Sequence, residues 1–100
     1  MNPILRSHIE EIKSLCKRQK VKRLYTFGSI NTSSFDVTSD LDFLVSFEKI
    51  ELLDYADYYF TLCEGLEGIT GRKVDLVTEN SLENPYFIDS VEKTKELIYE

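Results

Sequence analysis

The sequence predicts a small α+β (α/β) fold, with a mixed three-stranded sheet and helices packed on one face. Three long segments place apolar residues at helical spacing, and three short segments are rich in β-branched and aromatic residues. Along the chain they run helix, strand, loop, strand, helix, strand and helix, an order that packs helices against a sheet. We expect residues 1–100 to form a single domain, because a chain of this length can bury only one core.

The composition excludes several classes of protein. Hydrophobic residues make up 42% of the chain and charged residues 30%, which is ordinary for a globular domain. No stretch approaches the roughly 18 consecutive apolar residues of a membrane span, and the first residues lack the layout of a signal peptide. A net charge of −6 argues against general nucleic-acid binding, which depends on cations neutralising phosphates. We therefore expect a cytoplasmic protein, in which Cys16 and Cys63 are buried free thiols.

The first helix is expected to begin at Asn2 and Pro3, residue types favoured at the N-cap and at the first helical position. Its apolar stripe consists of Ile4, Leu5, Ile9, Ile12, Leu15 and Cys16. His8 lies in this helix and is expected to be partly exposed. The basic run 17–23 fits a solvated helix end whose cations complement the helix dipole, or alternatively a contact surface for a nucleotide or a partner.

Two strands are predicted on either side of a polar loop. Residues 21–27 form the first strand, and Gly28 ends it at a sharp turn where backbone can approach a ligand closely. Residues 41–47 form the second strand, in which one face should receive the helices and the other should carry Asp42 and, by register, Asp40. The helix-facing residues are Leu41, Phe43, Val45 and Phe47, and the opposite face has Asp42, Leu44 and Ser46.

The second half of the chain is predicted to place one strand between two helices. Residues 48–67 form the longest helix, with Gly68 or Gly71 as its C-terminal stop. Residues 72–77 form a third strand, whose apolar run is interrupted by Asp75. Asn84 and Pro85 begin a last helix, and its apolar contacts are expected to be Phe87, Ile88, Val91, Leu97 and Ile98.

Three carboxylates make the candidate site. Asp40 and Asp42 lie about 6.6 Å apart on one side of an extended chain, where ionised carboxylates repel and raise each other's pKa. A divalent cation between them removes that cost, and oxygen ligands suit Mg²⁺. Asp75, in an otherwise apolar strand, also needs a partner or a metal. With backbone N–H groups of the Gly28-Ser29 turn available for phosphate, these residues predict a Mg²⁺-phosphate site.

Other uses of these carboxylates fit less well. An EF-hand calcium loop begun at Asp36 would need glycine and glutamate where Leu41 and Phe47 stand. Asp40 and Asp42 leave little room for a sugar ring between them, which argues against a glycosidase. The chain has a single histidine, so no Ser-His-Asp or Cys-His set is predicted. Phosphoryl or nucleotidyl transfer, in which two Mg²⁺ ions about 3.5–4 Å apart clamp the attacking and leaving oxygens, fits best.

The spacing of these motifs resembles the signature of the DNA polymerase beta-like nucleotidyltransferase superfamily. Gly28-Ser29 is followed by ten residues, by Asp40-Leu41-Asp42, and later by the strand 72–77 with Asp75. A short chain with this layout is similar to the minimal nucleotidyltransferases (MNT), which are often the antitoxin half of HEPN/MNT toxin–antitoxin pairs. The likeness extends over nearly the whole chain.

The resemblance implies a nucleotidyltransferase fold and a role for each motif. Gly28 and Ser29 would hold the phosphates of the nucleotide, and Asp40 and Asp42 would bind the metals. Asp75 would complete the metal site and help deprotonate the attacking hydroxyl. Such proteins transfer AMP from ATP to a tyrosine of a partner HEPN toxin and so silence it. The resemblance therefore implies a protein adenylyltransferase that uses ATP, two Mg²⁺ ions and a HEPN-type partner.

One departure from the family pattern affects the phosphate site. Related proteins usually carry one or two arginines directly after Gly-Ser, whereas residues 30–34 are Ile, Asn, Thr, Ser and Ser. A cation for the triphosphate is thus missing from its expected place, and Arg72, Lys73 or a side chain of the partner would have to replace it. This keeps a second hypothesis open, a non-catalytic antitoxin that neutralises its partner by covering its surface.

Overall fold

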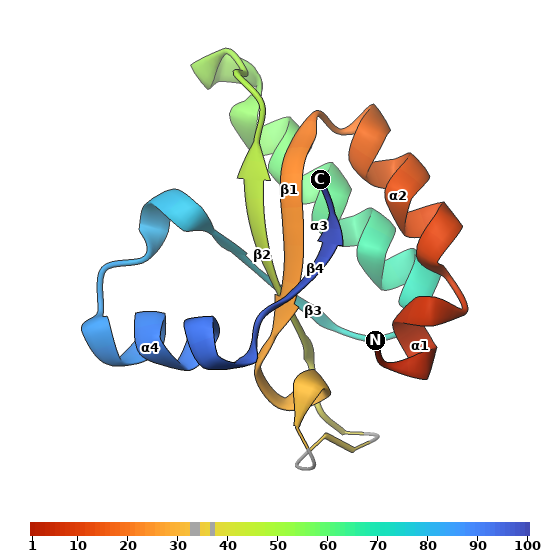
Figure 1. The fold of residues 1–100 in the computed structure, drawn as a ribbon. Helices are drawn as coiled ribbons and strands as arrows, with labels where there is room; N and C mark the ends of the chain where they lie inside the picture. The colour runs from red at the N-terminus through yellow and green to blue at the C-terminus, as the bar shows by residue number, and fades with distance from the viewer. Residues whose placement is uncertain (33–34, 37) are drawn as a thin grey trace.

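The computed structural model describes residues 1–32, 35–36 and 38–100. Helices and strands alternate in these residues much as the sequence predicts (Figure 1). The α-helices are α1 (Pro3–Arg6), α2 (Ile9–Arg18), α3 (Leu52–Thr70) and α4 (Pro85–Thr94). The strands are β1 (Val21–Phe27), β2 (Leu41–Phe47), β3 (Val74–Thr78) and β4 (Glu96–Tyr99), and two short 3-10 helices are η1 (Gly28–Asn31) and η2 (Glu79–Ser81).

The strands form one mixed sheet in the order β3-β2-β1-β4. β2 and β3 are parallel, and β1 is antiparallel to both β2 and β4. The parallel pair is joined through α3, because a parallel connection must cross from one end of the sheet to the other. The α+β class and the mixed sheet are confirmed, whereas the predicted number of three strands is wrong by one.

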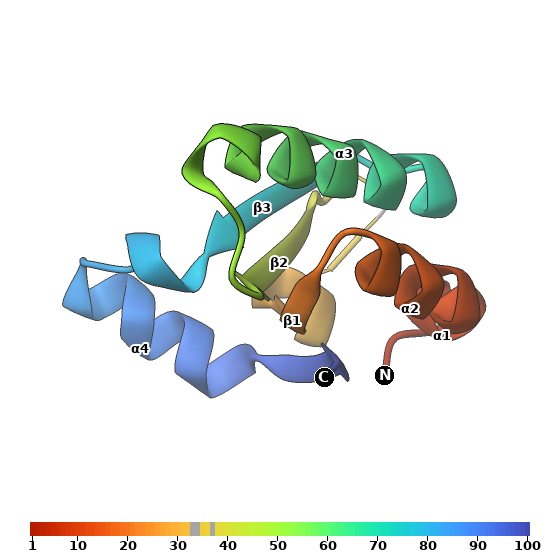
Figure 2. The same cartoon turned by 90° about the horizontal axis from the view of Figure 1, so that it is seen from above.

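Helices cover both faces of the sheet. α1, α2 and α3 contribute Leu5, Ile12 and Leu62 to the larger core, which also contains Leu24 and Phe43 of the sheet. α4 lies on the opposite side of the strands, as Figures 1 and 2 show. There it forms a second cluster, made of Phe27, Leu44 and Val91. The prediction that the helices pack on one face is therefore wrong for α4.

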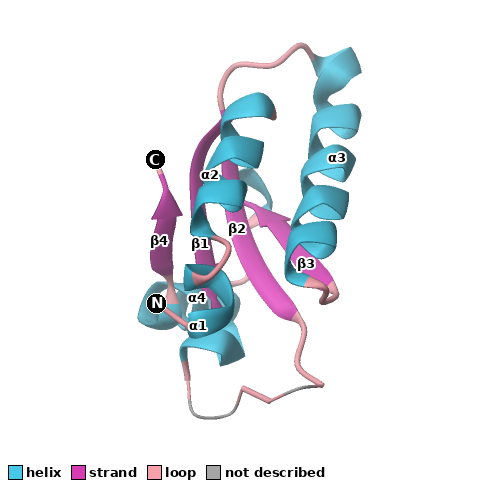
Figure 3. Cartoon of the chain, turned by 90° about the vertical axis from the view of Figure 1, so that its right-hand side faces the viewer, coloured by secondary structure: helices cyan, strands magenta, loops and turns pink. Residues whose placement is uncertain are grey.

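The alternation predicted for residues 41–47 is confirmed. Leu41, Phe43 and Val45 are buried in the larger core and Phe47 packs against it, while Leu44 belongs to the cluster under α4. Because side chains of a strand alternate between its faces, Asp42 must lie on the α4 face. In Figure 3 α2 and α3 lie in front of the sheet and α4 lies behind it.

The end of the chain forms a strand that we predicted as helix. α4 ends at Thr94, and Lys95 already has extended backbone angles, φ −66° and ψ 142°. Leu97 and Ile98 then point to opposite faces, since Ile98 is 4% exposed in the larger core and Leu97 is 45% exposed. Two adjacent apolar residues fit a helical stripe as well as a strand, so only the vacant edge of β1 decides between them.

The other helix boundaries follow from their caps. The Asn2 and Asn84 side chains accept hydrogen bonds from the N–H groups of Ile4 and Tyr86, both at 2.9 Å, as expected of N-caps. Gly71 ends α3 with φ 67°, so it is the one of the two candidate glycines that serves as the stop. The first predicted helix is split into α1 and α2 between Arg6 and Ile9.

The two cysteines are free thiols in the described part of the chain, and Cys16 is fully buried. Burial raises the pKa of Cys16 to about 12. Cys63 is only half-buried, with its Sγ 3.9 Å from the carbonyl oxygen of Val74. Among the described residues, no helix has the length and apolar character that crossing a membrane would require.

Two glycines of α3 provide a matched test of this packing. A Cβ on Gly65 would lie 2.7 Å from Cδ2 of the buried Leu15, whereas a Cβ on Gly68 would meet nothing within 4 Å. Gly68→Ala should raise the free energy of unfolding by about 0.5–1 kcal/mol through helix propensity. Gly65→Ala should lower the free energy of unfolding by about 1 kcal/mol, because the clash with Leu15 costs more than the gain in helix propensity. Urea denaturation measures both, and equal stabilisation by the two substitutions would contradict the packing of α2 on α3.

Candidate functional site

The pairing of β2 with β3 brings two of the predicted carboxylates together. Asp42 is the register partner of Asp75 in this parallel pair. Partners in neighbouring strands point to the same face, and the flanking residues Leu41 and Leu76 are buried on the other face. Asp40 precedes Asp42 by two residues and is exposed, so it follows the same side of the chain where β2 begins. The three carboxylates therefore lie on the α4 face, at the ends of β2 and β3 where both strands start.

The Gly28 turn lies directly against Asp42. Phe27, the last residue of β1, is the register partner of Asp42, and Gly28 follows with φ 77°. A Cβ built on Gly28 would lie 2.6 Å from Asp42 Oδ2, so close that the carboxylate would have to shift. Only glycine combines this positive φ with this close approach. The sequence prediction that Gly28 permits a close backbone contact is confirmed, and the contact is with the carboxylate itself.

The environment of Asp42 disfavours its charge. Its pKa is raised from 3.8 to about 6, first by burial and then by the charges of Asp75 and Asp40. Two effects of the same sign add here, since low dielectric and neighbouring carboxylates both favour the protonated form. A carboxyl group that titrates near neutral pH beside other carboxylates is a feature typical of functional sites.

Gly28 and Ser29 contribute differently to the turn. The Gly28 N–H donates a hydrogen bond of 2.8 Å to Thr94 Oγ1, so it is engaged within the protein. The hydroxyl of Ser29 makes no hydrogen bond with the residues that the structure describes. The 3-10 helix η1 starts at this turn, and the first N–H groups of such a helix have no partner inside it. Polar groups for a phosphate are therefore expected from Ser29 onward.

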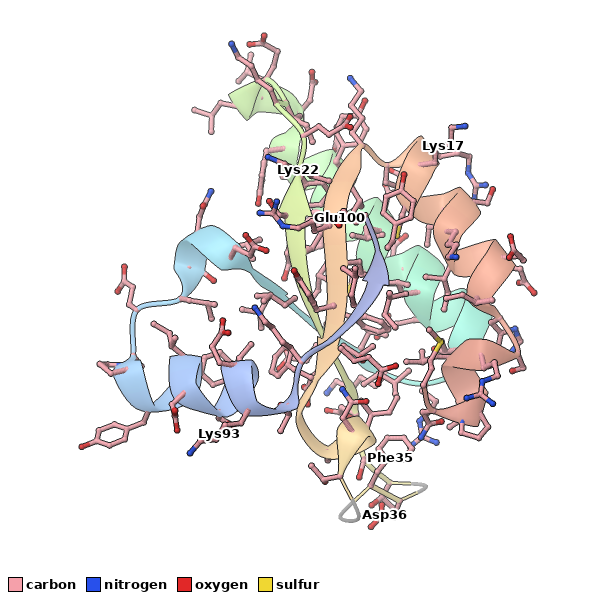
Figure 4. The ribbon with its side chains drawn as sticks, viewed as in Figure 1. Lys17, Lys22, Phe35, Asp36, Lys93 and Glu100 are labelled. Carbon is pink, nitrogen blue, oxygen red and sulfur yellow. The ribbon has the colours of Figure 1, made fainter. Side chains whose placement is uncertain are left out.

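Arg72 holds the connection between β1 and β2. Its Nη2 donates to the backbone carbonyls of Asp36 and Ser39, both at 2.7 Å, and its guanidinium lies 4.6 Å from the centre of the Phe35 ring. Figure 4 shows Phe35 and Asp36 in this connection at one end of the molecule. These contacts occupy Arg72 and fix the chain just before Asp40, which argues against Arg72 as the missing cation for a triphosphate.

Lys73 is the remaining candidate among the two basic residues. Its carbonyl accepts a hydrogen bond of 3.0 Å from the N–H of Leu41, so the pairing of β2 and β3 continues one residue before Val74. Since Leu41 pairs with Val74, the residues that precede them, Asp40 and Lys73, lie opposite each other. Its side chain is exposed and makes no ion pair with the described residues. Of the stretch 30–34, where the resemblance to the family predicted a cation, Ser33 and Ser34 lie outside the described residues.

Two residues that the sequence analysis did not single out complete the site. Thr94 accepts the Gly28 N–H through its side chain, and its carbonyl accepts a hydrogen bond of 2.7 Å from Asn31 Nδ2. Asn31 also donates to the carbonyl and hydroxyl of Thr26 at 3.3 and 3.2 Å. These partners lie 66 and 63 residues apart in the chain, and a polar residue at the end of a helix gives no signal of such a contact.

The carboxylate oxygens of Asp40, Asp42 and Asp75 favour a hard cation, although these side chains do not converge on one point. Carboxylate oxygens are the ligands that Mg²⁺ prefers. Within the described residues, no group of three His, Cys, Asp or Glu side chains is arranged so that it could hold a metal ion.

Comparison with known proteins identifies the family of this chain. The nucleotidyltransferase domain family matches residues 8–98. A Methanocaldococcus jannaschii protein, provisionally named a protein adenylyltransferase, is 38% identical over 96 residues, which are 96% of this chain and 90% of that protein.

Two solved structures share the fold. One is a structure of a provisionally assigned minimal nucleotidyltransferase, 36% identical, with a TM-score of 0.66 and coverage of 92% of this chain and 90% of that chain. The other contains a tri-AMPylated Shewanella oneidensis HEPN toxin in complex with an MNT antitoxin, with 19% identity, a TM-score of 0.62 and coverage of 93% and 70%. Because the family match spans nearly the whole chain and the M. jannaschii relative is of similar length, this chain belongs to the nucleotidyltransferase domain family and is an enzyme of its minimal type.

Proposed function

We propose that this nucleotidyltransferase is Mg²⁺-dependent and transfers AMP from ATP to a tyrosine of a HEPN-type toxin, for which it acts as the antitoxin. The observation that carries the proposal is the register of β2 and β3, which places Asp42 beside Asp75 on one face. Gly28 lies against the carboxylate of Asp42, which a Cβ at this position would approach to 2.6 Å. A phosphate chain bound at the turn would therefore lie next to the carboxylates.

Asp40, Asp42 and Asp75 are the residues that would hold Mg²⁺, two ions in the arrangement we favour. Bound Mg²⁺ would supply charge neutralisation for the attacking and leaving oxygens of an in-line displacement. The raised pKa of Asp42 supports this assignment, because a nearby cation would relieve the repulsion that raises it. Gly28 and Ser29 would hold the phosphates, Gly28 by letting the turn lie close to Asp42 and Ser29 by its hydroxyl and N–H.

The reaction forms one bond and breaks one bond at the α-phosphorus of ATP. The tyrosine oxygen of the partner bonds to this phosphorus, the bond to the bridging oxygen of the β-phosphate breaks, and pyrophosphate leaves. We assign the phenolic proton to Asp75, which is exposed and so can be reached by a side chain of another protein. Such a reaction needs little beyond positioning and charge neutralisation, which a small domain can provide.

The antitoxin role is supported by the structural neighbour whose HEPN toxin carries AMP groups and is bound to an MNT antitoxin. We place the reaction in the cytoplasm, where ATP is available. A non-catalytic antitoxin remains the second candidate, and one observation favours it. Residues 30–32 contain no cation at the turn, and Arg72 is engaged with the carbonyls of Asp36 and Ser39.

The first prediction from this proposed function concerns stability and pH without metal. Since Asp42 titrates near pH 6 in the folded chain and near 3.8 when unfolded, its charge lowers stability above about pH 6, and the effect disappears toward about pH 4. In EDTA, Asp42→Asn should therefore raise the free energy of unfolding at pH 8 and leave it unchanged near pH 4. Mg²⁺ at pH 8 should raise the melting temperature of the wild type and have little effect on Asp42→Asn.

The matched control is Asp57→Asn, which changes an exposed carboxylate of α3. This variant should respond to Mg²⁺ as the wild type does. A stability difference between wild type and Asp42→Asn that is the same at pH 4 and pH 8 would contradict the assignment.

The second prediction concerns AMP transfer. With Mg²⁺, α-labelled ATP and a HEPN-type toxin, label should appear on a toxin tyrosine. Asp40→Ala, Asp42→Ala or Asp75→Ala should reduce it at least about 100-fold, because each removes charge neutralisation at the reacting phosphate. Asp57→Ala should label normally. If the variants still label the toxin, the enzymatic assignment fails, and if Asp42→Ala still blocks toxicity in co-expression, occlusion is the mechanism.

The third prediction separates two neighbouring basic residues. Lys73→Met should raise the KM for ATP by about three- to tenfold with little change in melting temperature, since an exposed cation next to the site is lost. Arg72→Met should lower the free energy of unfolding by about 1–3 kcal/mol, because the carbonyls of Asp36 and Ser39 lose their donor. Steady-state kinetics and urea denaturation measure the two effects, and the reverse pattern would make Arg72 the phosphate ligand.

A further inference from the structure

The hydroxyl of Thr94, the last residue of α4, lies against the backbone of the Gly28 turn. We propose that Thr94 is a positioning residue for nucleotide binding, which holds this turn against Asp42 and so sets where the phosphates lie relative to the carboxylates. The inference rests on the proposed function, because the turn is taken to be the phosphate site. It adds a role for α4, an element that none of the predicted motifs includes.

The Thr94 hydroxyl is fixed in its orientation. Oγ1 donates a hydrogen bond of 2.9 Å to the carbonyl of Ser90 one helical turn earlier. A hydroxyl has one hydrogen, so this bond leaves a lone pair of Oγ1 for the N–H of Gly28 at 2.8 Å. The Gly28 N–H is thereby directed toward α4. Asp42 Oδ2 lies on a different side of Gly28, 2.6 Å from where a Cβ would stand.

Asn31 ties the other end of η1 to the same residue. Its Nδ2 donates to the carbonyl of Thr94 at 2.7 Å. The same amide group reaches the carbonyl of Thr26 at 3.3 Å and its hydroxyl at 3.2 Å. Thr26 is only 1% exposed in the middle of the sheet, so it is a rigid anchor. Both ends of the four-residue helix are thus bound to Thr94, one through its side chain and one through its backbone.

α4 is itself anchored on the sheet beside the carboxylates. Phe87, Val91 and Thr94 share one side of the helix, because they follow each other at four- and three-residue spacing. The Phe87 ring packs edge-on against Phe27 with 5.8 Å between centroids, and Val91 is fully buried. Phe27 is in turn the register partner of Asp42. A displacement of α4 would therefore move the turn relative to the carboxylates.

A loss of this contact should weaken nucleotide binding without unfolding the protein. Thr94 is half-buried, and valine keeps its shape while removing the hydroxyl. Misplacement of a binding group by about 1 Å is enough to reduce the efficiency of a site strongly. Thr94→Val should therefore release the Gly28 N–H and raise the dissociation constant for a nucleotide, and Thr94→Ser should restore both.

The experiment compares the full-length wild type, Thr94→Val and Thr94→Ser by two measurements. Amide hydrogen exchange of Gly28, followed by NMR, reports the contact itself. Calorimetry with AMP-PNP and Mg²⁺ reports nucleotide binding. Thr70→Val is the matched control, because Thr70 Oγ1 donates to the carbonyl of Leu66 at 2.7 Å and accepts from the N–H of Arg72 at 3.4 Å, the same pattern at the end of α3.

In Thr94→Val we expect Gly28 exchange to rise at least about tenfold and the dissociation constant at least about fivefold, the loss expected for one hydrogen bond. Thr94→Ser should stay within about twofold of the wild type. Thr70→Val should lose similar thermal stability and leave the exchange of Gly28 unchanged. Thr94→Ala provides a second hydroxyl-free variant if valine disturbs the packing of α4.

Two results overturn the inference and are distinguishable from failure of the proposed function. Unchanged Gly28 exchange in Thr94→Val would show that the contact does not hold the turn. Faster exchange with an unchanged dissociation constant would show that the turn does not position the nucleotide. If the wild type itself binds no AMP-PNP, the proposed function fails first, and this role of Thr94 fails with it.

Discussion

The site depends on the parallel pairing of β2 with β3 in one particular register. A shift by one residue would turn Asp42 or Asp75 into the larger core, because side chains alternate between the faces of a strand. The core prevents this shift, since Leu41, Phe43 and Leu76 must remain buried on the other face. Hydrophobic burial on the α3 side thus determines which side chains meet on the α4 side. The position of the carboxylates follows from packing that includes none of them.

The negative charge of Asp42 does not stabilise the fold. Asp42 is partly buried beside two other carboxylates, and its raised pKa is the result. Asp36 shows the opposite case, since hydrogen bonds from Thr38 and Ser39 lower the pKa of its exposed carboxyl group. One carboxylate is satisfied within its own loop, while the other lacks a compensating cation among the described residues. A structure that conflicts with local stability in this way usually does so at a functional site.

Contacts from distant parts of the chain complete the site. Arg72 fixes the connection that leads into Asp40, and Thr94 binds the turn that faces Asp42. Thr94 is the last residue of α4 and Arg72 follows α3 after the cap Gly71, so both contacts come from the C-terminal ends of helices. Both contacts lie at the same end of the sheet, where β1 ends and β2 and β3 begin. These contacts hold Asp36, Ser39 and the glycine turn next to the carboxylates.

Several features were determined by the sequence alone, and they are the local ones. The bounds of β1 and β2, the asparagine caps and the shared side of Asp40 and Asp42 depend on neighbours a few residues away. Only the tertiary structure decided that residues 96–99 pair with β1, that α4 covers the face of the carboxylates, and that Arg72 and Thr94 serve the loop and the turn. These outcomes depend on strand edges and hydrogen-bond partners up to 66 residues away, which no periodicity or motif encodes.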